Sequence, residues 1–265
     1  MPRPLIFVLV VALCGALDIA LHMAGGDLIP MPSAFSPLVD RFGFSTVAAI
    51  WIALAFTSMG LLFLAWAWRM AGTGRQKGLR YGLALGLMIF VAMFEGVGLL
   101  GTPLTSELIM GLADAIPIAL LIALFGWTLA KDSPDAPAHL PAWPVLIAFA
   151  LVYGLARTGV QMLGLIESGL EERPLPSLIW PFAMGAAIGV LFLAMTDALR
   201  GLSRASGALA FGFGMFGANW ALFMAFVPMV FPDALLDTAM RVGLDILLVT
   251  CAALMVGLKR YQGAG

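Results

Sequence analysis

The sequence predicts an all-α integral membrane protein whose eight transmembrane helices form two parallel, tandem four-helix repeats. Three observations predict this class: the composition, eight separate apolar stretches, and a duplication within the chain. Hydrophobic residues make up 62% of the 265 residues and charged residues 11%, whereas soluble domains contain about 25% charged residues. We therefore expect the chain to lie within a lipid bilayer.

The apolar stretches are each long enough to cross a hydrocarbon core of about 30 Å as a helix. They fall at residues 4–24, 46–68, 79–100, 106–130, 142–165, 176–198, 207–230 and 234–257. None shows the alternating pattern of a membrane β-strand, and backbone groups in lipid must be satisfied internally, so helices are expected. The first stretch also resembles a signal peptide. We expect a retained span, because residues 16–25 align with residues 155–164 of the second repeat.

The duplication is clearest where residues 50–78 align with residues 179–207, each position recurring 129 residues later. Trp51 meets Trp180 and Gly60 meets Gly189 in this alignment. It predicts a first repeat at 1–131 and a second at 145–265. Residues 132–144 form a proline-rich linker between them, since proline cannot continue a helix.

Basic residues in short loops predict the orientation, because lysine and arginine mark the cytoplasmic side. Ten of them fall on alternate loops: Arg3, Arg69, Arg75, Lys77, Arg80, Lys131, Arg200, Arg204, Lys259 and Arg260. Only Arg41 and Arg173 fall on the other side, where the loops are acidic. We expect a multi-pass protein of the cell inner membrane with both termini cytoplasmic. An even number of spans in each repeat makes the repeats parallel.

Seven ionisable residues of the predicted spans are singled out as intramembrane, each in the outer half of its helix. They are Asp18, His22, Glu95, Asp114, Arg157, Arg241 and Asp245. An unpaired charge within a bilayer costs about 2.5–3.5 kcal/mol on insertion scales, so these groups are expected to pair or to face water. Their common depth predicts a polar cavity that opens toward the outside.

Two ion pairs are expected among these groups. Asp18 and Arg157 occupy equivalent positions in the two repeats and are expected to face each other. Arg241 and Asp245 are four residues apart on one helix face. Both pairs suit a structural role as well as a site. Four carboxylates against two arginines leave two negative charges near His22.

Three further side chains are expected to line the cavity. Gln161 occupies the position equivalent to His22, while Asn219 and Trp220 add an amide and an aromatic wall. The predicted outward binding site therefore comprises Asp18, His22, Glu95, Asp114, Arg157, Gln161, Asn219, Trp220, Arg241 and Asp245. Some of these have donor atoms suited to a metal, but no motif such as His-Glu-x-x-His is present, so no metal, catalytic residue or cofactor is assigned.

Small residues within the spans indicate helix packing. Cys14 and Cys251 are interpreted as small buried hydrophobes and not as a disulfide or metal pair.

Glycine pairs are expected to let helices approach closely; they are Gly82 with Gly86, and Gly185 with Gly189.

Three functions remain open from the sequence. The first is a transporter-like carrier that binds a small polar or cationic solute or a proton. The second is a non-catalytic subunit or assembly factor that binds another membrane protein. The third is an intramembrane enzyme or sensor, with Asp18 and His22 as base and orienting group, although the sequence favours a non-enzyme. Besides the lipid bilayer, the expected partners are thus a small ligand or a membrane protein, and no feature predicts nucleic-acid binding.

Overall fold

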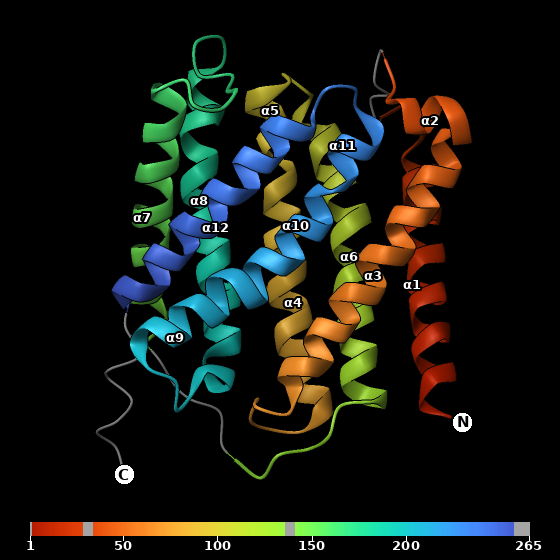
Figure 1. Ribbon diagram of the computed structural model, residues 1–265, viewed down its shortest axis with the longest axis vertical. Helices are drawn as coiled ribbons and strands as arrows, with labels where there is room; N and C mark the ends of the chain where they lie inside the picture. Colours follow the sequence, from red (N-terminus) through yellow and green to blue (C-terminus); the bar gives the residue numbers. More distant parts are fainter. Residues whose placement is uncertain (1, 29–33, 136–140, 257–265) are drawn as a thin grey trace.

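The chain folds into a bundle of long helices that extend from one end of the molecule to the other (Figure 1). The structure, a computed structural model, describes residues 2–28, 34–135 and 141–256. Within these ranges, eight segments are long and apolar enough to cross a membrane: Arg3–Gly25, Phe44–Ala67, Gly74–Leu99, Leu104–Thr128, Ala142–Met162, Pro174–Leu199, Arg204–Val230 and Leu235–Val256. The prediction of an all-helical protein with eight candidate membrane spans is confirmed.

Five spans are single α-helices, and three are interrupted. The single helices are α1 (Arg3–Gly25), α3 (Phe44–Ala67), α6 (Leu104–Thr128), α7 (Ala142–Met162) and α12 (Leu235–Val256). The third span is α4 (Gly74–Met93) with α5 (Glu95–Leu99), and the sixth is α8 (Pro174–Met195) with the 3₁₀ turn η2 (Thr196–Leu199). The seventh is α9 (Arg204–Leu209), the π-helix η3 (Ala210–Gly217), α10 (Ala218–Met224) and α11 (Phe226–Val230). The short elements η1 (Gly26–Leu28) and α2 (Pro37–Phe42) follow α1.

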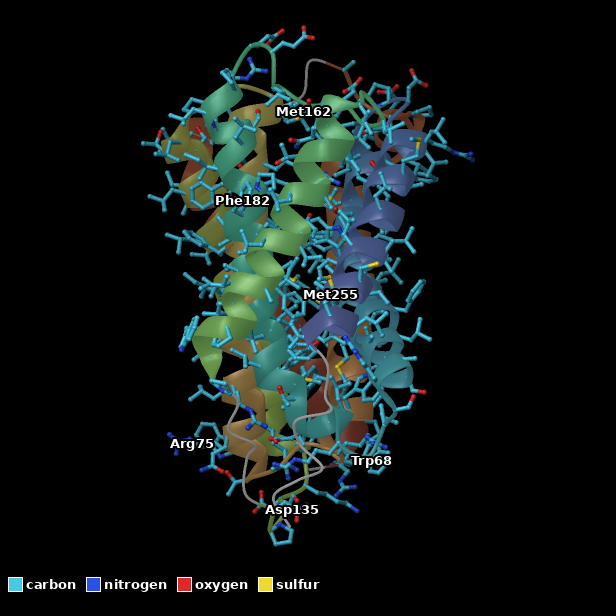
Figure 2. The ribbon with its side chains drawn as sticks, turned by 90° about the vertical axis from the view of Figure 1, so that its left-hand side faces the viewer. Trp68, Arg75, Asp135, Met162, Phe182 and Met255 are labelled. Carbon is cyan, nitrogen blue, oxygen red and sulfur yellow. The ribbon has the colours of Figure 1, made fainter. Side chains whose placement is uncertain are left out.

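The two ends of the bundle differ in charge. We call the end at which α1 begins the basic end. It carries Arg3, Arg69, Arg75, Lys77, Arg80, Lys131, Arg200 and Arg204. Lys259 and Arg260 lie outside the described residues. The opposite end, here the acidic end, carries Asp40, Glu167, Glu171, Glu172, Asp233 and Asp237, with Arg41 and Arg173. Figure 2 shows Arg75 and Asp135 toward one end and Met162 toward the other.

Glycine allows α4 and α6 to pack closely. A Cβ atom added at Gly78 would lie 2.7 Å from the Cα of Gly126, and one added at Gly82 would lie 2.6 Å from a backbone oxygen of α6. Gly185 of α8 meets the backbone of α7 in the same way, at 2.6 Å. The predicted packing role of Gly82 and Gly185 is confirmed, since no larger side chain fits at these distances.

Two tryptophans make matching hydrogen bonds between helices distant in the sequence. Trp51 of α3 donates its indole N–H to the carbonyl of Leu222 in α10 at 3.0 Å, and Trp180 of α8 donates to the carbonyl of Val91 in α4 at 2.9 Å. Each acceptor lies two residues before the last residue of its helix. Carbonyls of a last helical turn have few backbone partners, and the Val91 carbonyl accepts one further bond, from the Phe94 N–H at 3.2 Å. Each indole therefore adds a donor to a carbonyl near a helix interruption.

The two cysteines have different environments. Both are free; Cys14 is buried, whereas Cys251 is exposed on α12. The prediction is therefore right for Cys14 and wrong for Cys251. A helix at the edge of a bundle turns one side toward lipid, where an apolar side chain is stable without protein neighbours.

Candidate functional site

The seven ionisable residues predicted inside the membrane separate into two clusters. The carboxylate–histidine cluster consists of Asp18 and His22 on α1 and Asp114 on α6. The arginine network is built on Glu95 of α5, Arg157 of α7, and Arg241 and Asp245 of α12. Among the described residues, no hydrogen bond or ion pair links one cluster to the other.

Arg157 is the centre of the arginine network. Its side chain is fully buried, and its Nη1 donates to Asp245 Oδ1 at 2.8 Å while its Nη2 donates to Glu95 Oε1 at 2.9 Å. The guanidinium also lies 5.7 Å from the centre of the Trp180 ring. Bonds between ionised groups are stronger than neutral ones, so Arg157 fastens α5, α7 and α12 together.

Arg241 adds a second cation to the network. Its Nη1 donates to Glu95 Oε1 at 3.0 Å, so one carboxylate oxygen accepts from two arginines. Its Nη2 donates to the carbonyl of Glu167 at 2.6 Å, and its Nε donates to Asp237 one helical turn away. Arg241 thereby ties α12 to the loop at the acidic end.

Asp245 is the most enclosed carboxylate of the network. Besides Arg157, it accepts the hydroxyl of Tyr153 at 2.8 Å on Oδ1 and the indole N–H of Trp220 at 3.0 Å on Oδ2. Both of its oxygens therefore have donors. Two largely buried carboxylates, Glu95 and Asp245, face two arginines, whereas the third, Asp237, is 37% exposed. This near balance of charge is typical of a structural ion-pair network.

Gln161 lies beside a small cavity at the edge of the network. The cavity holds about 10 Å³ and is lined by Glu95, Gln161, Ser177 and Trp180, among others. This volume suits about one water molecule. Gln161 Oε1 and Ser177 Oγ are both buried without a protein partner. The lining therefore offers hydrogen-bonding atoms to a water molecule.

Asn219 lies apart from both clusters. Its amide Nδ2 donates to the hydroxyl of Tyr81 at 2.9 Å and to the carbonyl of Met215 at 2.5 Å. It therefore joins the seventh span to α4. Trp220, its neighbour in sequence, contacts the arginine network instead.

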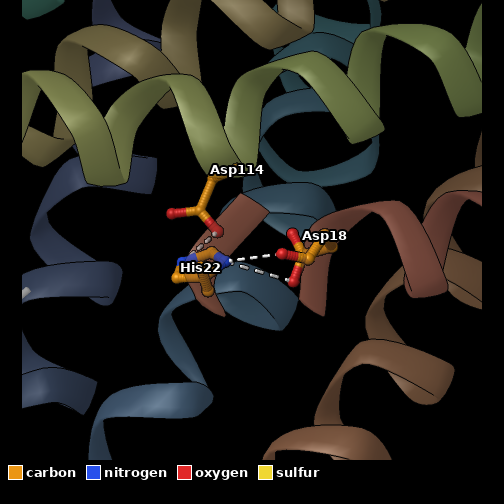
Figure 3. Close-up of side chains that lie close together, drawn as sticks. All are labelled: Asp18, His22 and Asp114. Atoms are coloured by element: carbon orange, nitrogen blue, oxygen red, sulfur yellow. Dashed lines mark hydrogen bonds and ion pairs between the residues drawn. The ribbon is translucent and has the colours of Figure 1, made fainter. Parts of the chain in front are cut away.

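The carboxylate–histidine cluster places one imidazole against two carboxylates (Figure 3). His22 Nδ1 lies 2.9 Å from the Asp18 carbonyl oxygen and 3.6 Å from Asp18 Oδ2, and His22 Nε2 lies 3.7 Å from Asp114 Oδ1. Residues four apart share a helix face, and α1 packs along α6. The His22 side chain is 33% exposed, whereas those of Asp18 and Asp114 are almost fully buried.

This cluster has more carboxylates than basic partners. Within the part of the chain that the structure describes, His22 is the only basic residue paired with Asp18 or Asp114. Asp18 Oδ1 is buried and has no hydrogen-bond partner. An ionised carboxylate in that position is costly unless it is neutralised. The cluster is therefore suited to bind a proton or a cation.

Both ion pairs expected from the sequence are wrong. Asp18 does not face Arg157, because α1 packs against α6 and α3 and not against α7. Arg241 has Asp237 one turn before it and Asp245 one turn after it, and it pairs with Asp237. Asp245 instead pairs with Arg157 on the neighbouring helix. Spacing along one helix does not determine which of two neighbouring helices supplies the counter-charge.

Three residues near the clusters were not singled out from the sequence. Tyr153 lies four residues before Arg157 and binds the same carboxylate. Asp237 lies four residues before Arg241. Glu107 lies seven residues before Asp114, is buried, and accepts the hydroxyl of Thr102. Helical spacing from a predicted site residue was the signal available for all three.

A larger cleft lies at the basic end. It holds about 480 Å³ and is lined by Arg3, Phe7, Trp68 and Lys131, among others. The sequence predicts a polar cavity among the clustered charges, which lie toward the acidic end, whereas the cavity found there, beside Gln161, is only water-sized. The cleft is thus far from the clustered charges along the bundle.

Comparison of the chain with models of known protein families, with curated proteins and with solved structures found no match. The functional argument accordingly rests on the chemistry of the two clusters.

Proposed function

We propose that this multi-pass protein is a transporter-like carrier that binds a small cation or a proton in the outward half of the bundle. The observation that supports it most is the carboxylate–histidine cluster, where Asp18 and Asp114 are buried against a single histidine. Ionisable groups inside a membrane are costly and mark ion or proton pathways. A bound cation or proton neutralises this excess charge, and the partly exposed His22 provides access.

The ten residues predicted to line the site are proposed to divide into two roles. Asp18, His22 and Asp114 bind the ion. The others hold the surrounding helices at a fixed distance from it: Glu95, Arg157, Gln161, Asn219, Trp220, Arg241 and Asp245. Their bonds lie between different spans, as those of Arg157 and Asn219 illustrate, and this suits a scaffolding role.

The carrier is proposed to consist of two four-helix repeats, residues 1–131 and 145–265, joined by the linker 132–144, of which residues 136–140 lie outside the described residues. The matching tryptophan bonds support this arrangement. Trp51 of the first repeat donates to the second repeat, and Trp180 of the second donates to the first. Related halves that pack in this reciprocal way can rock against each other, as carriers require.

The basic end is proposed to face the cytoplasm, which places both termini inside the cell and the acidic end outside. The enrichment of arginine and lysine near Arg3, Arg75 and Lys131 supports this orientation under the positive-inside rule. The carboxylate–histidine cluster lies near the end of α1 that leads to the acidic end. An ion would then enter from outside the cell inner membrane.

Flux through reconstituted vesicles tests the proposal. The purified chain is inserted into liposomes, gradients of protons and of mono- and divalent cations are applied in turn, and entry is followed with enclosed dyes. We expect ion-dependent flux that is lost in Asp114→Asn and kept in Asp40→Asn, which makes the same change at an exposed carboxylate.

Two results would contradict the carrier proposal. One is the absence of flux for every ion tested, and the other is equal flux in the wild type and Asp114→Asn. Co-purification of another membrane protein in stoichiometric amount, together with absent flux, would favour a non-catalytic subunit.

A further inference from the structure

We infer that Asp18, His22 and Asp114 form a binding site for a divalent first-row transition-metal ion. This inference rests on the proposed function, since it names the class of cation. Each residue offers one ligand atom, and these three atoms lie within 4.8 Å of one another (Figure 3). The cluster brings together α1 and α6, which are distant in sequence.

The histidine is already oriented as a metal ligand. Its Nδ1 lies 2.9 Å from the Asp18 carbonyl oxygen, and because a carbonyl only accepts, Nδ1 carries the hydrogen. In the neutral imidazole, Nε2 then presents a lone pair on the side of Asp114. Metal-bound histidines typically donate their second N–H to a carbonyl or carboxylate in this way.

The distance between the facing ligand atoms suits an intervening ion. His22 Nε2 and Asp114 Oδ1 are 3.7 Å apart, which is too long for a direct hydrogen bond. Metal bonds of about 2.0–2.1 Å in tetrahedral geometry separate two ligand atoms by about 3.3–3.5 Å. A movement of a few tenths of an ångström would therefore bring both atoms into coordination.

A second, independent observation is the unsatisfied oxygen of Asp18. Asp18 is 2% exposed, and its Oδ1 has no hydrogen-bond partner. Buried polar atoms nearly always have a partner, and exceptions require an explanation. Coordination of a cation supplies the missing partner for this oxygen.

The donor set indicates the class of metal. One imidazole nitrogen with two carboxylates suits zinc, iron, cobalt, nickel or manganese, whereas calcium and magnesium prefer oxygen ligands alone. Two carboxylates also match the charge of a divalent ion. Three protein ligands leave at least one position open, as in sites that exchange ligands, and the His22 side chain, 33% exposed, is not closed off by the rest of the protein.

Titration of the purified full chain with Co²⁺ tests the site, because cobalt bound to nitrogen and oxygen absorbs visible light. We expect one Co²⁺ per chain, displaced by Zn²⁺ but not by an equal concentration of Mg²⁺. His22→Gln, Asp18→Asn and Asp114→Asn should each weaken binding by at least about tenfold, the lower range for loss of a supporting residue around a metal. Asp40→Asn is the matched control and should bind as the wild type does. Far-ultraviolet circular dichroism verifies the fold of each variant.

The absence of saturable Co²⁺ binding to the wild type would overturn the metal site, as would equal binding by the wild type and the three folded variants. Proton flux that depends on Asp114 without metal binding would overturn the metal assignment alone and leave the carrier proposal standing. Metal binding that depends on the three residues, without any flux, would support the site and contradict the carrier.

Discussion

Replacement of Arg157 by methionine should lower the free energy of unfolding by about 3–5 kcal/mol, the range for breaking a buried ion pair from one side. Methionine preserves much of the length of the side chain but removes the charge. Glu95 keeps Arg241 at 3.0 Å, whereas Asp245 keeps only the neutral donors Tyr153 and Trp220. The cost therefore arises mainly from one buried carboxylate that has lost its cation.

A double-mutant cycle separates the cost of the unpaired Asp245 carboxylate from the cost of lost side-chain packing. Asp245→Asn removes the charge that Arg157→Met leaves behind, since the two side chains pair at 2.8 Å. We expect the double variant to be more stable than the sum of the single effects implies, with a coupling energy of about 2–3 kcal/mol.

Unfolding of the detergent-solubilised protein by dodecyl sulfate, followed by circular dichroism, gives the required free energies. An Arg157→Met variant within about 1 kcal/mol of the wild type, which is the range of exposed ion pairs, would refute the reasoning. Strictly additive single and double variants would also refute it, because the carboxylate and the guanidinium would then be energetically independent.

The remaining predictions use the same unfolding measurement. Without metal, Asp114→Asn should leave stability unchanged or raise it by up to about 1 kcal/mol, since ion-binding sites are commonly destabilising; a loss like that of an ion-pair variant would contradict this. Trp51→Phe and Trp180→Phe should each cost about 1 kcal/mol, the net value of one hydrogen bond, and markedly unequal losses would argue against equivalent roles. Gly78→Ala should cost about 1–3 kcal/mol by overpacking, because its Cβ would meet the backbone of α6. A Cβ at Gly159, inside α7, meets nothing within 4 Å, so Gly159→Ala should leave stability unchanged or raise it by up to about 1 kcal/mol.

The sequence alone predicts the helices well because span formation depends on local composition. Apolar stretches of sufficient length identify all eight candidate spans, and the depth of each charge follows from its position along the helix. Even the common position of Asp18, Glu95 and Asp245 toward one end of the bundle is visible in this way. The length of a span and the position of a charge along it can each be read from the sequence of that helix alone.

The pairing of the charges depends on which helices are neighbours, which the sequence does not state. Asp237 and Asp245 each lie four residues from Arg241, yet only Asp237 forms an ion pair with it. Asp245 instead forms its ion pair with Arg157 on α7. Likewise, Asp18 meets Asp114 only because α1 packs against α6. The division into a neutralised network and an anionic cluster is therefore a property of helix packing.

The central claim is that the carboxylates of the carboxylate–histidine cluster exchange a cation or proton. The most direct measurement is the infrared difference spectrum of the reconstituted protein recorded while pH or divalent metal concentration is changed. We predict a carboxylate signal that disappears in Asp18→Asn and in Asp114→Asn and persists in Asp40→Asn. A spectrum that is unchanged in both cluster variants would contradict the account.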